Sequence, residues 1–334
     1  KPIRHRANLK VVTGVRVDRL LLENRRAIGV AGIRNGRPVE YRTEGEVILS
    51  AGTIATPKIL QLSGIGPAGH LAACGVPVIL DAPGVGQNLR EHFLLIQNYR
   101  LKDWSHSQNK CFSGLGLAKS LAEYLLLRRG PLSNSSYTAG AFVRSDPRAN
   151  RPDGQLMFVP WTRDWTTKKF GDYPGMNVFS YQLRPDSEGS LSIESADPAR
   201  PLRIAPNYLA TQHDRERSVA LVRYLRTLMA TRPIANMVLA ETEETSWART
   251  DDEILELFLQ RGAPGYHNCG TVAMGQGRRA VLDERLRIRG LDGVRVMDLS
   301  ILPELLSGNT NAPVMAMAWR AADLFIEDRR RHIA

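Results

Sequence analysis

Two short segments near the C-terminal end carry the residue types best suited to acid–base chemistry. His267 lies in the first, GAPGYHNCGTVAMG, where flanking glycines allow the backbone to approach a ligand closely. A neutral imidazole titrates near neutral pH and can accept a proton from a hydroxyl group. Taken alone, however, this histidine is more typical of a hydrogen-bonded structural residue than of a catalytic one.

The second segment, SGNTNAP, contains Asn309 and Asn311. An asparagine amide cannot act as a base at neutral pH, but it can donate a hydrogen bond to a substrate oxygen. The same two residues are equally suited to cap the helix that follows. Cys269 lies close to His267, but a cysteine–histidine nucleophile would need a sulfur that faces the substrate and a third group that orients the imidazole.

A third segment, GIGPAG, contains Gly64, Gly66 and Gly69 in the G-x-G-x-x-G spacing of a dinucleotide-binding turn. Such a turn requires a strand before it, a helix after it, and an acidic residue about 20 residues further on. Here the glycines follow a predicted helix, Pro67 interrupts the motif, and no acidic residue stands at a suitable strand end. The segment is therefore interpreted as a loop that ends a helix.

Composition and charge restrict the class of protein. The 334 residues, 43% of them hydrophobic, can bury a sizeable core in about two domains. The net charge of +11 comes from scattered basic residues without interleaved aromatic residues, which predicts a solvated surface and no nucleic-acid partner. No segment approaches the roughly 18 apolar residues of an integral membrane span.

The three cysteines are far apart and form no C-x-x-C motif. This spacing disfavours a zinc site, and no other metal site is predicted. A sparse, odd number of cysteines is typical of a reducing compartment. We therefore expect a cytoplasmic protein, with peripheral association with the inner membrane as the alternative.

The pattern of apolar residues and turn signals predicts the elements that must position these side chains. Residues 8–50 read as strands with a turn at Asn35-Gly36. A helix follows, with Thr56 as its cap, Pro57 at its first position and Gly64 at its end. Other predicted elements are strands at 93–101 and within 154–195, and helices at 116–128, 212–231, 250–261 (with a Thr250/Glu253 capping box) and about 313–327.

The segment GTIATPKILQLSGIG resembles the second signature of the glucose–methanol–choline (GMC) flavoprotein oxidoreductases. That signature has a pair of small residues, Ser/Thr-Pro, two aliphatic residues and Ser-Gly-aliphatic-Gly. Other segments resemble the family in the same order along the chain: NLKVVTGVRVDRLLLENRRAIGV, APGVGQNLREH, YLLLRRGPLSNSSYTAGAFVRS, GSLSIESADPARPLRIAPNYL, YHNCGTVAMG and VRVMDLSILPELLSGNTNAP. The resemblance covers nearly the whole chain and is strongest to the bacterial choline-dehydrogenase-like group.

The resemblance implies a mixed α/β (α+β) fold with two domains. Residues 1–91 and 265–334 would form the remainder of an FAD-binding domain. Residues 92–264 would form a substrate-binding domain, with an antiparallel sheet and flanking helices. Family members begin with a G-x-G-x-x-G turn that holds the ADP half of FAD, and this chain lacks it. The chain is thus expected to correspond to about the C-terminal three fifths of a family member, with the N-terminal part of the FAD-binding domain missing.

The resemblance also assigns roles to individual residues. The family motif H-x-x-G-T-x-x-M-G places His267 against the flavin as the general base, and Asn309 at the second active-site position, where its amide would orient the substrate oxygen. Thr310 and Asn311 would lie near the pyrimidine edge of the flavin. The N-terminus of the following helix would favour negative charge there. Cys269 becomes a packing residue.

Three further cofactor-binding residues are implied. Asp298 and Leu299, in VRVMDLSILP, match a position whose backbone meets FAD, although the family commonly has a residue smaller than leucine there. Val17 matches a position whose backbone meets adenine. Without the resemblance, all three would be ordinary strand residues. His92 and His213 are expected to have surface or structural roles.

The implied activity is FAD-dependent oxidation of the CH–OH group of an alcohol, with a hydride passing to flavin N5 and the electrons passing to oxygen, a quinone or another acceptor. Two alternatives are a non-redox FAD-containing lyase of the same fold and a non-catalytic fragment without flavin. Choline as substrate would call for an acidic or aromatic cage, and Trp161, Trp165 and Tyr181 lie in the right domain for one. The sequence specifies neither the alcohol nor the oligomeric state.

Overall fold

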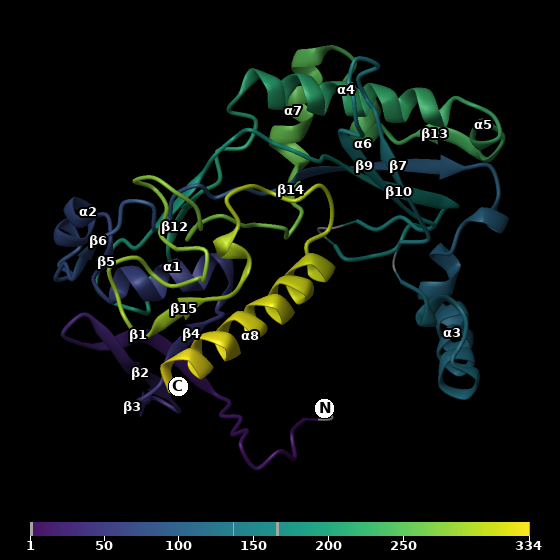
Figure 1. The fold of residues 1–334 in the computed structure, drawn as a ribbon. Helices are drawn as coiled ribbons and strands as arrows, with labels where there is room; N and C mark the ends of the chain where they lie inside the picture. Colours follow the sequence, from purple (N-terminus) through teal and green to yellow (C-terminus); the bar gives the residue numbers. More distant parts are fainter. Residues whose placement is uncertain (1–2, 136, 165–166, 334) are drawn as a thin grey trace.

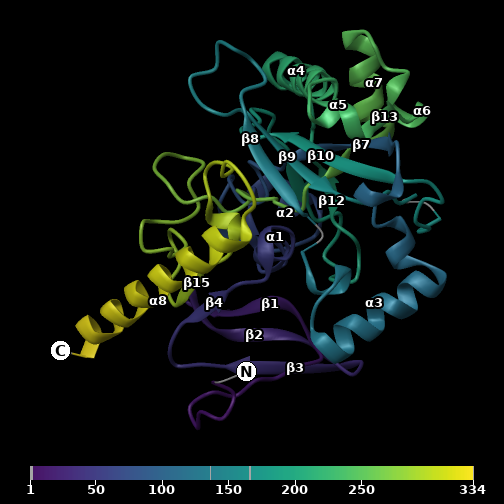
Figure 2. The same cartoon turned by 90° about the vertical axis from the view of Figure 1, so that its right-hand side faces the viewer.

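The computed structural model describes residues 3–135, 137–164 and 167–333. The chain has a mixed α/β fold with antiparallel sheets, as expected. A three-stranded sheet lies at one end of the molecule and a larger sheet at the other (Figures 1 and 2). Among the described residues, no helix combines the length and apolar character needed to cross a bilayer.

The three-stranded sheet is an antiparallel meander of β1 (Val15–Glu23), β2 (Arg26–Arg34) and β3 (Arg37–Arg42). Its second turn is the predicted Asn35-Gly36 pair. Both residues have positive φ, 51° and 75°, as a tight two-residue hairpin turn requires. The hairpin prediction is confirmed.

Helix α1 (Gly52–Leu62) follows β4 (Val47–Leu49) and begins earlier than predicted. Thr56 is not its cap but an internal residue. Its hydroxyl accepts a hydrogen bond from the Ala51 N–H at 3.1 Å and donates to the Asp298 carboxylate at 2.6 Å. The prediction of the helix start is wrong because a distant carboxylate, rather than a local cap, uses the threonine hydroxyl.

Pro57 is likewise inside α1 rather than at its first position. A proline has no N–H to donate to the carbonyl one turn earlier, which belongs to Thr53. The hydroxyl of Thr271 donates to that carbonyl at 2.6 Å instead. The predicted end of the helix is confirmed, because Gly64 follows the C-cap Ser63 with φ of 79°. The GIGPAG segment therefore ends a helix at Gly64, as interpreted, but it is not only a loop. It continues into the two-residue strand β5 (Ile65–Gly66) and the start of helix α2 (Ala68–Ala73).

The larger sheet has the order β13-β7-β10-β9-β8, with β14 also paired to β7. Its strands are β7 (Phe93–Leu101), β8 (Ala139–Val143), β9 (Gly154–Val159), β10 (Gly175–Gln182), β13 (Val238–Glu241) and β14 (Ala263–Pro264). Helices α4 (Gln212–Met229) and α7 (Asp251–Arg261) cover one face (Figure 1).

Alternation along β10 separates the two faces of this sheet. Val178 packs toward the helices, in a cluster with Leu221 and Leu225 of α4. Phe179 and Tyr181 lie on the opposite face. Two residues per repeat is the period of a strand, so every second side chain of β9 and β10 faces away from the helices. The capping box predicted for α7, between Thr250 and Glu253, is present.

The remaining elements are short, except for the helices α3 and α8. They are β5 (Ile65–Gly66), α2 (Ala68–Ala73), β6 (Leu80–Asp81), α3 (Gly114–Leu127), β11 (Ser190–Ser192), β12 (Arg203–Ala205), α5 (Ile234–Met237), α6 (Glu243–Ser246), β15 (Val294–Val296) and α8 (Asn311–Ile333), with 3₁₀ turns at Trp104–His106, Asn109–Phe112, Pro131–Ser133 and Leu299–Ile301. Helix α8 extends past the predicted range at both ends.

The largest core joins the two ends of the chain. Leu20 and Leu60 from the first part pack in one cluster with Val296 and Ile301 from the last part. The clusters on the larger sheet are made of residues between these segments. The division into 1–91 with 265–334 and 92–264 stays a prediction.

Candidate active site

His267 and Asn309 meet directly, although they lie in different segments. Asn309 Nδ2 is 3.0 Å from His267 Nε2. His267 is 8% exposed and follows β14, while Asn309 lies just before α8. The structure thus brings together the two residues that the sequence suggested as base and orienting amide.

A second histidine, to which the sequence analysis gave no catalytic role, lies against the other side of His267. The Nδ1 atoms of His92 and His267 are 2.9 Å apart, and His92 Nε2 is 3.1 Å from the carbonyl oxygen of Leu183. His92 is fully buried and stacks on Tyr181 with ring centroids 4.4 Å apart. The available signal was its place in NLREH, immediately before the buried strand β7.

The Leu183 carbonyl fixes the hydrogen positions along this chain of contacts. A carbonyl oxygen only accepts, so His92 Nε2–H donates to it. Burial lowers the pKa of His92 to about 3 and also lowers the pKa of His267, so both rings are neutral. His92 Nδ1 therefore accepts from His267 Nδ1–H, which leaves the lone pair of His267 on Nε2, facing the Asn309 amide.

Glu91 anchors both histidine segments through the backbone. Its Oε1 accepts the N–H of His92 at 2.9 Å and the N–H of His267 at 2.8 Å. Its Oε2 accepts from the Asn268 side chain at 3.4 Å. Desolvation raises the pKa of this carboxyl, while the backbone hydrogen bonds oppose that shift. Glu91 thus holds the His267 loop against the start of β7.

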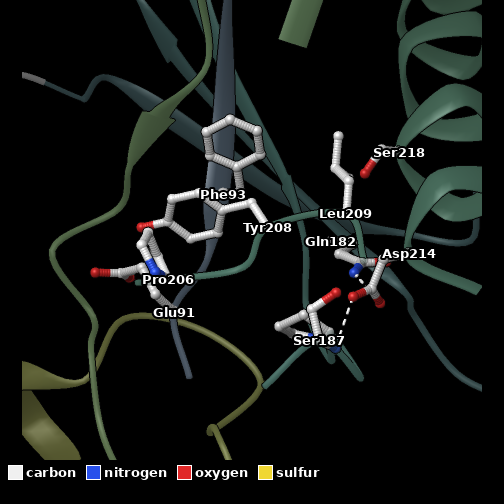
Figure 3. Close-up of a pocket in the computed structure, with 10 residues that line it drawn as sticks. Glu91, Phe93, Gln182, Ser187, Pro206, Tyr208, Leu209, Asp214 and Ser218 are labelled. Atoms are coloured by element: carbon white, nitrogen blue, oxygen red, sulfur yellow. Dashed lines mark hydrogen bonds between the residues drawn. The ribbon is translucent and has the colours of Figure 1, made fainter. Parts of the chain in front are cut away.

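Glu91 also lines a small cavity (Figure 3). Phe93, Tyr208 and Asp214 also line it, and its volume is about 10 Å³. That volume accommodates at most one water-sized molecule, so the cavity is not a site for an organic substrate. A larger groove of about 970 Å³ lies along Glu46 of the β4 region and Asp328 of α8, and neither hollow is lined by His267 or Asn309.

Asp298 uses its side chain inside the protein. The carboxylate accepts from the Gly52 N–H at 3.0 Å, from the Thr56 hydroxyl at 2.6 Å and from the Ser300 N–H at 2.8 Å. Only its backbone therefore remains for a ligand, which is the kind of contact that the family resemblance implies. Leu299 is half-buried and packs against the cluster that contains Cys269.

The other predicted cofactor residues lie in two places. Thr310 is buried, and Asn311 is the exposed first residue of α8, so both directly follow Asn309. Val17 is on β1, half-buried against the main core. Val17 thus belongs to a different element from the residues that accompany the His267–Asn309 pair.

An open edge lies beside the His267 loop. Strands β4 and β15 pair in parallel, so their carboxyl ends share one edge, where Ser50 and Ala51 are exposed. Gly52 follows with φ of 87°, and no atom lies within 4 Å of the position that a Cβ would occupy. The next residue, Thr53, donates to the Asn268 carbonyl at 2.8 Å. Backbone at this edge can therefore be approached closely by a ligand.

Other candidates from the sequence have different surroundings. Cys269 is fully buried and burial raises the pKa of its thiol to about 12, as befits a packing residue. Tyr181 is buried against His92, so it does not offer a free wall for a cation cage. Trp161 packs near Phe170, with ring centroids 5.6 Å apart, and Trp165 lies outside the described residues.

Asp186, His213 and Asp214 form a group whose potential ligand atoms lie within 4.8 Å of one another, in the part of the chain that the structure describes. The Asp214 carboxylate already accepts from Gln182 Nε2 and from the N–H groups of Asp186 and Ser187. These bonds account for the burial of Asp214 at the start of α4. The expectation of no metal site stays a prediction.

Comparisons with known proteins show the family of the chain. Residues 1–94 match the N-terminal domain and residues 185–318 the C-terminal domain of the GMC oxidoreductases. The chain is 33% identical over 329 residues to an alcohol dehydrogenase [acceptor] of Pseudomonas putida, and 35% identical over 326 residues to an oxygen-dependent choline dehydrogenase of Rhizobium johnstonii. These matches cover 96% and 97% of this chain but 58% and 59% of the relatives, so the chain spans about three fifths of their length.

Solved structures give the same result for the fold. Pyridoxine 4-oxidase from Mesorbium loti matches with a TM-score of 0.82 at 26% identity, covering 100% of this chain and 60% of that protein. A formate oxidase from Aspergillus oryzae, known from work on modification of its FAD, matches with a TM-score of 0.92 at 24% identity, covering 98% and 63%. The chain belongs to the GMC oxidoreductase family.

Proposed function

We propose that this chain supplies the catalytic pair of an FAD-dependent oxidoreductase that acts on the CH–OH group of an alcohol. The observation that carries the proposal is the 3.0 Å contact between His267 Nε2, which bears a lone pair, and Asn309 Nδ2, which bears protons. An alcohol hydroxyl can interact with both groups at once. Its proton can be transferred to the base, and its oxygen can accept a hydrogen bond from the donor.

The alcohol hydroxyl would bind beside these two atoms, within reach of both, and displace the direct hydrogen bond between them. Its oxygen takes over the hydrogen bond from Asn309 Nδ2, and its O–H points at His267 Nε2. As the carbon–hydrogen bond breaks, the hydroxyl proton moves to Nε2 and the alcohol becomes a carbonyl compound. A bound FAD would supply the acceptor for the hydride from the alcohol carbon. His92 then accepts the hydrogen bond from His267 Nδ1–H throughout, which keeps the ring from turning.

The residues present fit such a cofactor. The carboxyl edge of β4 and β15, with the open space at Gly52, suits a closely approaching dinucleotide backbone, and Asp298 and Leu299 lie on that edge. Thr310 and Asn311 would hold the pyrimidine end at the start of α8, where the helix dipole favours negative charge. Val17 would meet the adenine. The electron acceptor would be oxygen, a quinone or another carrier.

The pH dependence of flavin reduction should report the state of His267. The base is active when neutral, and burial lowers its pKa from the ordinary value of about 6.5. The rate of reduction by an alcohol should therefore be constant at neutral pH and fall only as the pH drops through this lowered value. Stopped-flow measurement of flavin reduction across the acidic range checks this, and an acid limb at or above the ordinary histidine pKa would contradict it.

One experiment distinguishes alcohol oxidation from the two alternatives, a lyase of the same fold and a non-catalytic fragment. The flavin-containing enzyme is mixed anaerobically with a series of alcohols, and the flavin absorbance is followed. Alcohol oxidation bleaches the flavin, whereas a lyase of the same fold would convert its substrate while the flavin stays oxidised. A preparation of residues 1–334 that stays colourless when FAD is added would favour the third interpretation, a non-catalytic fragment.

A further inference from the structure

Two side chains from the larger sheet lie behind Asn309. Gln155 of β9 donates from Nε2 to Asn309 Oδ1 at 3.0 Å. Tyr181 of β10 donates its hydroxyl to Gln155 Oε1 at 2.6 Å. Gln155 and Tyr181 are directly paired across the two strands, and they are 6% and 1% exposed. Both side chains are therefore fixed on rigid sheet backbone behind the pair.

The orientation of the Asn309 amide decides whether His267 can act as a base. The two ends of an amide have nearly the same shape, but one donates and the other accepts. With Nδ2 toward His267, the imidazole lone pair on Nε2 is hydrogen-bonded. With the amide turned over, Oδ1 would face that lone pair, and the ring would have to carry a proton on Nε2, which removes the base.

Gln155 favours the orientation in which Asn309 Nδ2 faces His267. Burial raises the pKa of the Tyr181 hydroxyl above its usual range, so the phenol keeps its proton and needs an acceptor. Gln155 Oε1 is that acceptor, so Gln155 must turn its Nε2 toward Asn309. Asn309 then has to present Oδ1 to Gln155 and Nδ2 to His267. The hydrogen-bond directions set by the Tyr181 hydroxyl therefore agree with those set by the Leu183 carbonyl through His92. Both place the His267 Nε2 lone pair opposite Asn309 Nδ2.

We propose that Gln155, held by Tyr181, is a positioning residue that sets the amide orientation of Asn309 and thereby keeps His267 in its base form. Its importance for turnover rests on the proposed function, whereas its effect on the protonation of His267 Nε2 is a property of this chain alone. Gln155 lies outside the motifs that identify the family, so its role comes from the strand pairing and not from the sequence pattern.

The test exchanges donor for acceptor with almost no change of shape. In Gln155→Glu, the ionised carboxylate can only accept, so the Asn309 amide should turn its Nδ2 toward residue 155 and its Oδ1 toward His267. Among the described residues, the titratable groups bonded or stacked in this network are Tyr181 on β10, His267 across Asn309, and His92, which stacks on Tyr181 and contacts His267. His267 Nε2 should then carry a proton, either because the ring becomes an imidazolium that still donates from Nδ1 to His92, or because the ring gives up that bond and moves its proton from Nδ1.

The readout is ¹⁵N NMR of the chain labelled at histidine, which separates protonated from unprotonated imidazole nitrogens. His267→Gln assigns the signal. In the parent chain Nε2 should be unprotonated, and in Gln155→Glu it should become protonated, at neutral pH or as the pH is raised to ionise the carboxyl. Gln155→Met is the matched control, because it fills the space without an acceptor and should not force the turn.

An unchanged Nε2 signal in Gln155→Glu at every pH, or the same change in Gln155→Met, would overturn the inference. In the flavin-loaded enzyme, Gln155→Glu should slow reduction by about 10²-fold or more, and Gln155→Met by about tenfold. The Gln155→Met effect should vanish in an Asn309→Ala background, which a purely structural role would not predict. If no alcohol reduces the parent flavin, the proposed function fails while the NMR result still decides the inference.

Discussion

Replacing His267 with alanine is expected to slow the reduction of the flavin by an alcohol about 10²–10⁴-fold. The reason is that the variant loses the lone pair on His267 Nε2, which would accept the hydroxyl proton. Nε2 lies 3.0 Å from Asn309 Nδ2, which would bind the hydroxyl oxygen. Without the lone pair, the hydroxyl proton must go to water in a site where His267 itself is 8% exposed. Single-turnover stopped-flow measurement under anaerobic conditions isolates this step from reoxidation of the flavin.

The controls separate loss of the base from loss of the site. His213→Ala changes an exposed histidine at the start of α4 and should leave the rate unchanged. The His267→Ala variant should retain its flavin, and its residual rate should lack the acid limb of the parent enzyme. Near-normal flavin reduction in this variant would show that another group accepts the proton.

A second large effect is expected on stability, at the far end of α8. Asp328→Ala should lower the free energy of unfolding by about 3–5 kcal/mol. Arg295 is 1% exposed, and its Nη1 donates to Asp328 at 2.9 Å, while Arg285 and Arg287 donate to the same carboxylate at 2.7 and 2.6 Å. Removing the carboxylate leaves a buried guanidinium with only part of its charge compensated, by Glu46 at 3.0 Å.

Urea denaturation followed by circular dichroism measures this loss. Asp323→Ala is the matched control, because Asp323 is an exposed aspartate on the same helix, and its replacement should change stability by less than about 0.5 kcal/mol. The double variant Arg295→Met/Asp328→Ala should recover part of the loss, since it removes the uncompensated charge. Equal losses in Asp328→Ala and Asp323→Ala would mean that the buried ion pairs do not hold α8 in place.

The same ion pairs explain why the length of α8 was underestimated. The sequence near its C-terminal end is rich in charge, which locally favours an exposed, fraying terminus. The residues that hold this end, Arg285, Arg287 and Arg295, lie on other segments of the chain. The start of α1 was misplaced for the same kind of reason, since Thr56 bonds to Asp298, which is 242 residues away in the sequence.

The sequence by itself determined the features whose causes lie within a few residues. The Asn35-Gly36 hairpin, the capping box of α7 and the helix end at Gly64 each depend on neighbouring side chains and backbone angles. The motifs around His267 and Asn309 were also readable, because their residue types and spacing are local patterns. Membership of the GMC family followed from those motifs.

Only the tertiary structure decided which residues of the site form hydrogen bonds with one another. His92 is 175 residues from His267 in the sequence, and Gln155 is 154 residues from Asn309. The position of His92 before a buried strand is visible in the sequence, but neither contact is, because a hydrogen bond between distant segments exists only once the sheet and the loops have closed on each other. The direction of each bond, and with it the position of the lone pair on His267, depends on a carbonyl and a phenol that the folded chain places at the two ends of the network.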